Sequence, residues 1–74
     1  MDIKDVIEVD PQKMSGTPVF RDTRVPIQNL FDCLEDRDTI ERFLAQFPTV
    51  SREQVISVLE LSKASLLSHD EVAA

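Results

Sequence analysis

The sequence contains few of the residues that cross-link small proteins or bind metals. It has one cysteine, Cys33, and one histidine, His69, among 74 residues. A lone cysteine excludes a disulfide framework within the chain, and a four-ligand zinc site is not expected from so few ligands. The single glycine, Gly16, leaves no glycine-rich phosphate loop. We therefore expect no cofactor and no metal.

Basic charge and long apolar runs are also scarce. Eight basic side chains stand against 14 acidic ones, and the net charge of −6 argues against a protein that coats nucleic acid by itself. The longest apolar runs are two or three residues, far below the length that crosses a membrane. The N-terminus has mixed charge and no apolar leader-like stretch, so we expect a cytoplasmic protein without a membrane partner.

What remains is the composition of a folded domain, 42% hydrophobic and 30% charged. A chain this short buries only about 60% of its unfolded surface, so its stability needs help, and oligomerisation or partner binding is the expected source. We expect one domain over residues 1–74. It comprises a β-arm with turns (1–26), a tri-helical core (27–67) and a flexible tail (68–74).

The β-arm is predicted to consist of short strands between turns. The β-branched run Val6–Val9 and the pair Val19-Phe20 are separated by prolines and by a turn signal at residues 15–18. Prolines limit how much central sheet this segment forms, so we expect edge strands. Pairing of such an edge between two chains would bury Phe20. This predicts a homodimer with a dimer arm at Val19, Phe20 and Val25.

From Pro26 onward, apolar residues recur at helical spacing. The first helix is expected to start at Pro26, the second to stop before Pro48, and the third to run from Arg52 to Leu67. Three short amphipathic helices with short loops favour a compact common core. The predicted fold class is therefore mainly α, a three-helix homeodomain-like core with a helix-turn-helix corner, preceded by short strands.

Two cap patterns set the helix starts. Asp38 with Glu41 resembles a capping box before the second helix. Ser51 with Gln54 forms the pattern S-x-x-Q before the third helix, and Val50 lies where a hydrophobic staple begins.

A basic stretch and the start of the third helix are the candidate DNA-binding residues. Lys13, Arg21 and Arg24 lie in the arm, and Arg52 opens the helix that would enter a groove. A structural role at the junction between strand and helix is the alternative for Arg24, and it is favoured. The third helix carries no net charge, so DNA binding would depend on the arm or on a partner.

Catalytic chemistry is not expected. Cys33 falls inside the first helix and fits a packing role better than a reactive thiol. His69 lies in the tail, and the carboxylates between residues 32 and 38 lack calcium-loop spacing, so they are interpreted as a solvated loop and cap. No nucleophile–base or metal spacing is present, and we expect no enzyme.

The segment Gly16–Ile27, G-T-P-V-F-R-D-T-R-V-P-I, resembles the signature G-x-P-V-h-x-G-T-R-V-P-V of a family of small prokaryotic proteins, domain of unknown function 433. Phe47–Val55 is similar to the start of that family's last helix, and the resemblance spans about residues 3–67. Asp22 and Ser15 stand where the family commonly has glycine. Aspartate tolerates the left-handed backbone region, so the turn is expected to survive.

The resemblance implies an antitoxin-like protein with a tri-helical core, no enzymatic activity, and a PIN-like ribonuclease toxin as its partner. An acidic surface suits a basic, RNA-handling protein. The alternative is a dimeric helix-turn-helix autorepressor that binds operator DNA. A dimerisation module without its own ligand is the third hypothesis.

Overall fold

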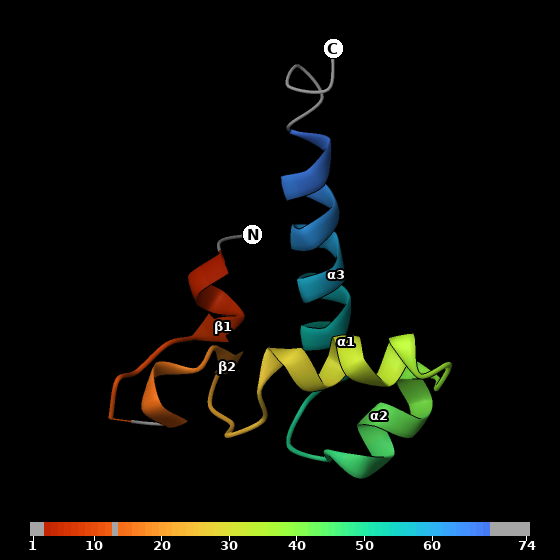
Figure 1. The fold of residues 1–74 in the computed structure, drawn as a ribbon, viewed down its shortest axis with the longest axis horizontal. Coiled ribbons are helices and arrows are strands. Elements are labelled where there is room, and N and C mark those ends of the chain that lie inside the picture. Colours follow the sequence, from red (N-terminus) through yellow and green to blue (C-terminus); the bar gives the residue numbers. More distant parts are fainter. Residues whose placement is uncertain (1–2, 13, 69–74) are drawn as a thin grey trace.

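The computed structural model describes residues 3–12 and 14–68. Two 3-10 turns, two strands and three helices follow one another along the chain (Figure 1). They are η1 (Ile3–Asp5), β1 (Ile7–Glu8), η2 (Met14–Gly16), β2 (Val19–Phe20), α1 (Ile27–Glu35), α2 (Ile40–Gln46) and α3 (Arg52–Leu67). The predicted mainly α fold class with short N-terminal strands is confirmed. Lys13, His69 and most of the predicted tail lie outside the described residues.

The two strands form a small antiparallel sheet, with Ile7 opposite Phe20 and Glu8 opposite Val19. An isolated bridge joins Val19 to Pro26 on the other side of β2. β2 therefore lies between two partners within its own chain, and the next segment leads directly into α1.

The third helix begins as its sequence predicts. The Ser51 hydroxyl accepts a hydrogen bond from the Gln54 backbone at 3.1 Å, and the Gln54 side chain accepts from the Ser51 backbone at 2.9 Å. This reciprocal pair satisfies two N–H groups at the helix start. Val50 and Val55, in the positions of a hydrophobic staple, are both buried.

The predicted cap of the second helix is wrong by one residue. Thr39, not Asp38, precedes the helix, and its hydroxyl accepts from the Arg42 backbone at 3.2 Å. Asp38 instead forms an ion pair with the Arg42 side chain at 3.2 Å. Asp38 and Thr39 both have side-chain oxygens that can accept a capping hydrogen bond. Thr39 is the cap because its extended backbone lies directly before the first helical residue, Ile40. Pro26 likewise lies just before the first helical residue, as the cap of α1.

The core joins the β-arm to all three helices. Phe20, Leu30, Phe43 and Val55 are fully buried, and the rings of Phe20 and Phe43 are 5.9 Å apart between centroids. Further core residues are Val6, Val25, Val50 and Val58.

This packing corrects the expectation of an exposed dimer arm. Val19 and Phe20 are 1% and 0% exposed, and Val25 is 8% exposed, all within a single chain. They contribute to the stability of the monomer because they fill its core. A second chain is not needed to cover them. The homodimer itself stays a prediction and needs a different surface.

α3 extends well past the other helices. In Figure 1 its first turns lie beside α1, and its last turns stand clear of α1 and α2, with only the N-terminal segment nearby. Leu66 and Leu67, near its end, are 76% and 64% exposed. In the described part of the chain, no helix has the length and apolar character needed to cross a membrane.

Candidate functional site

The turn between β2 and α1 is held by a buried threonine. The Thr23 hydroxyl donates to the Phe20 carbonyl at 2.7 Å and accepts from the Val25 backbone at 3.1 Å. Asp22 adopts a φ of 62°, in the left-handed region that favours glycine. This confirms that aspartate replaces the glycine of the signature without loss of the turn.

The same turn lies beside the start of α3. The Gln54 side chain donates to the Arg21 carbonyl at 3.0 Å, which ties the turn to the capping box. This contact brings Arg21, in the turn that also contains Arg24, to the N-terminal end of α3, which starts at Arg52. The sequence predicted these residues but not the bond that gathers them.

Two of these three arginines already have partners. The Arg21 guanidinium donates to the Lys4 carbonyl at 3.0 Å, and Arg52 pairs with Glu41 at 3.4 Å. Arg24 is exposed, and within residues 3–12 and 14–68 its side chain makes no hydrogen bond or ion pair. In particular, no ion pair joins Arg24 to Asp22 within these ranges. Arg24 is the arginine of this set that remains available to a phosphate or a carboxylate.

A cleft with an acidic lining lies at the other end of α1. It has a volume of about 270 Å³ and includes three carboxylates, those of Asp32, Asp36 and Asp38. Asp32 accepts from Gln28 at 2.9 Å. Within residues 3–12 and 14–68, the lining includes no basic residue; its other members are Asn29, Cys33, Gln46 and Phe47. We call it the acidic cleft.

The cleft raises the pKa of its thiol. Partial burial raises the pKa of Cys33, the negative charges of Asp38 and Asp36 raise it further, and Arg42 opposes them. A raised pKa leaves less thiolate at neutral pH, which agrees with the predicted packing role of Cys33. Among the described residues, no group of three or more histidine, cysteine or carboxylate side chains is placed to hold a metal ion.

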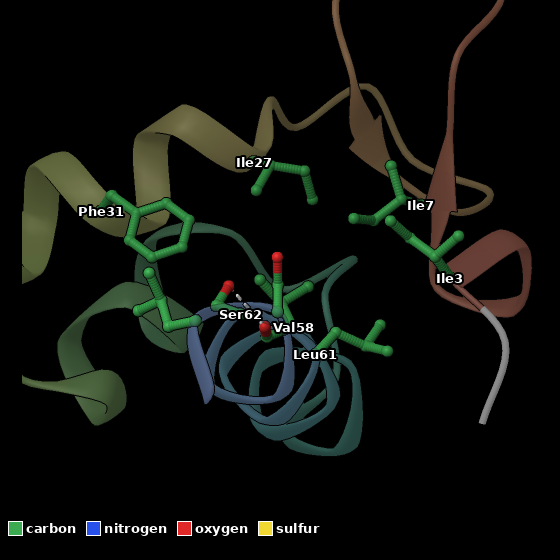
Figure 2. A pocket seen from close by; sticks show the side chains of 9 residues that line it. Ile3, Ile7, Ile27, Phe31, Val58, Leu61 and Ser62 are labelled. Atoms are coloured by element: carbon green, nitrogen blue, oxygen red, sulfur yellow. Dashed lines mark hydrogen bonds between the residues drawn. The ribbon is translucent and has the colours of Figure 1, made fainter. Parts of the chain in front are cut away.

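An apolar groove runs between the N-terminal segment, α1 and α3 (Figure 2). Its volume is about 440 Å³. Ile27 and Phe31 of α1 face Val58, Leu61 and Ser62 of α3 across it, with the N-terminal isoleucines at one side. The lining is completed by Ile3, Ile7, Ser65 and Leu66. We call it the apolar groove.

A second depression continues the apolar groove along α1. It has a volume of about 310 Å³ and shares Ile7, Ile27 and Phe31 with the groove, then adds Thr17, Pro18 and Gln28. None of the described residues that line either depression is charged. Sequence reasoning missed this surface because it assembles three distant segments. The available signal was Leu66, an apolar residue beyond the reach of the three-helix core.

The family comparison agrees with the signature. The model described as Protein of unknown function (DUF433) matches residues 7–61. The chain belongs to the DUF433 family. The matched segment runs from β1 to the middle of α3, so the DUF433 region contains the Thr23 turn, the capping box and the acidic cleft. The DUF433 match ends at Leu61, before the last groove residues of α3. No curated protein and no solved structure matches the chain.

Proposed function

We propose that this chain is an antitoxin-like binding module that neutralises a PIN-like ribonuclease toxin and catalyses no reaction itself. The observation that carries the proposal is the acidic cleft. A ribonuclease that binds an RNA backbone needs a basic surface. Three carboxylates line the cleft: Asp38 is already paired with Arg42, whereas Asp32 and Asp36 are exposed, and these two are complementary to such a surface.

The cleft also offers apolar contact. Phe47 lies in its lining and is half-buried, packed at 5.0 Å between ring centroids against the buried Phe43. An aromatic residue in a charged rim is a common anchor of protein interfaces. Basic side chains of the toxin would pair with Asp32 and Asp36 around this anchor.

The test is co-expression with the product of the adjacent reading frame, with growth and co-purification as readouts. The double variant Asp32→Lys and Asp36→Lys reverses the charge of the cleft at exposed positions. Glu60→Lys makes the same kind of change on exposed α3, away from the cleft, and serves as the control.

The proposal predicts a stable complex and restored growth with the wild type and Glu60→Lys. It also predicts that the cleft variant weakens binding by about tenfold or more, because opposite charges become like charges. No complex and no rescue with the wild type would contradict it. Equal binding by both variants would remove the cleft from the proposal.

A second candidate function, operator binding by an autorepressor, is favoured by one observation. The Arg21–Arg24 turn lies beside the N-terminus of α3, where a helix-turn-helix protein contacts DNA. The readout is a gel shift with the upstream operator at several salt concentrations. This function predicts salt-dependent binding that Arg24→Ala weakens, and binding that ignores salt, or none at low salt, would count against it.

A further inference from the structure

We infer that the apolar groove is a homodimer interface, in which α3 pairs antiparallel with α3 of a second copy around Ser62. The proposal is independent of the toxin, because it uses a different surface from the acidic cleft. It replaces the β-arm as the dimer surface, since the arm residues are already buried in one chain.

The first observation is that none of the described residues lining the groove carries a charge. The nine groove residues are seven apolar side chains and two serines. A basic toxin would find no complementary charge here, whereas a second copy of an acidic chain meets no like charge at this face. The lining therefore suits a second copy better than a basic partner.

The second observation is spacing. Val58, Ser62 and Leu66 are four residues apart on α3 and share one face of the helix. Ser62 is the midpoint, and Val58 and Leu66 lie about 6 Å from it along the axis on either side. In an antiparallel pair centred on Ser62, Leu66 of each copy reaches the level of Val58 in the other. A two-fold interface requires this reciprocity.

The third observation is that the groove combines an exposed leucine, Leu66, with open space beside Val58 that can receive the same leucine of a second copy. Leu66 is 76% exposed near the end of α3. At the level of Val58, the groove is open toward Ile27 and Phe31 of α1 (Figure 2). Leu66 of the second copy would fill this space, and Ile3, itself 53% exposed, would be covered at its side.

Close approach at the centre is also allowed. Ser62 is small, and its hydroxyl already donates to the Val58 carbonyl at 2.8 Å. Burial of this hydroxyl therefore leaves no donor unpaired. Two helices can approach closely at such a residue without a polar penalty.

The test compares two adjacent exposed leucines in the full chain by analytical ultracentrifugation over a concentration series. Leu66→Glu places a charge in the groove. Leu67→Glu makes the same change one residue later, at a similar exposure, on a part of α3 that does not line the groove. We expect the wild type to dimerise and Leu66→Glu to raise the dimer Kd by about 30-fold or more, because a charge enters an apolar contact. Leu67→Glu should stay within about threefold, as exposed substitutions do.

Cross-linking tests the two-fold axis directly. In a Cys33→Ala background, Ser62→Cys should form a disulfide-linked dimer on oxidation, since its two copies face each other. Lys63→Cys, about 100° around α3 from Ser62 and not among the residues that line the groove, should not. A wild type that stays monomeric up to about 1 mM overturns the proposal. Even a weak dimerisation free energy of about 4 kcal/mol would produce dimer at that concentration. Equal effects of the two leucine variants, or cross-linking at position 63 rather than 62, would overturn it as well.

Discussion

Thr23 should contribute more to stability than any exposed threonine, because its hydroxyl closes the turn of the family signature. The side chain is 6% exposed, donates to the Phe20 carbonyl and accepts from the Val25 N–H. Thr23→Val keeps the shape of the side chain and removes both hydrogen bonds. The Phe20 carbonyl retains the Thr23 N–H at 3.0 Å, whereas the Val25 N–H loses the acceptor that the hydroxyl supplied.

The expected loss follows from these two bonds. An unpaired buried N–H costs about 1–3 kcal/mol, and the lost bond to a carbonyl that keeps another donor costs about 0.5–1.5 kcal/mol. The new methyl group recovers at most about 0.8 kcal/mol. We therefore expect the free energy of unfolding to fall by about 1–3 kcal/mol. A domain of this size has a total of about 4–11 kcal/mol, so the change is large.

Urea unfolding followed by far-ultraviolet circular dichroism measures this loss. The chain has no tryptophan or tyrosine, which makes its helices the better probe. Protein concentration is held constant, since dimerisation would shift the apparent stability. Thr49→Val is the control, because Thr49 is exposed in the loop before α3. A Thr23→Val variant within about 0.5 kcal/mol of the Thr49→Val variant would show that the Thr23 hydroxyl does not stabilise the turn.

Three further predictions concern the backbone, a cap and the thiol. Asp22 has a φ of 62°, a backbone conformation that glycine adopts without strain and alanine does not. Asp22→Gly should therefore raise the free energy of unfolding by up to about 1 kcal/mol and Asp22→Ala should lower it, as measured by urea unfolding of both variants. Ser51→Ala should cost about 1 kcal/mol by the same assay through loss of the capping box, and a cost near zero would contradict that role. Asp38→Asn should lower the raised pKa of Cys33 and speed its alkylation by iodoacetamide below that pKa, where thiolate is scarce. Asp32→Asn, whose charge is not among the causes of the shift, is the control, and equal rates would contradict the assignment.

The helices could be predicted well because their signals are local. The third helix was predicted over Arg52–Leu67, the range that the structure shows, since Ser51 and Gln54 cap it through residues three apart. The choice between Asp38 and Thr39 failed because both are good caps and backbone angles decide between them. The family's glycine positions were also informative: Ser15 and Asp22 both adopt positive φ.

Burial of the arm and the site surfaces could not be read from the sequence. Phe20 is buried by Phe43, 23 positions away, and no local pattern encodes that contact. The groove needs side chains from the N-terminal segment, α1 and α3 together. The acidic cleft was anticipated only as a solvated run of carboxylates. Its cleft shape depends on Gln46 and Phe47, which α2 brings beside them.

Inhibition of a ribonuclease in solution is the direct readout of the proposed neutralising activity. The purified product of the adjacent reading frame is incubated with an RNA substrate, and this chain is added in increasing amounts. If this chain neutralises the toxin as proposed, cleavage should fall to background once its subunits match those of the ribonuclease, and the cleft variant Asp32→Lys with Asp36→Lys should need about tenfold more protein. Undiminished cleavage with the wild-type chain in large excess would contradict the account.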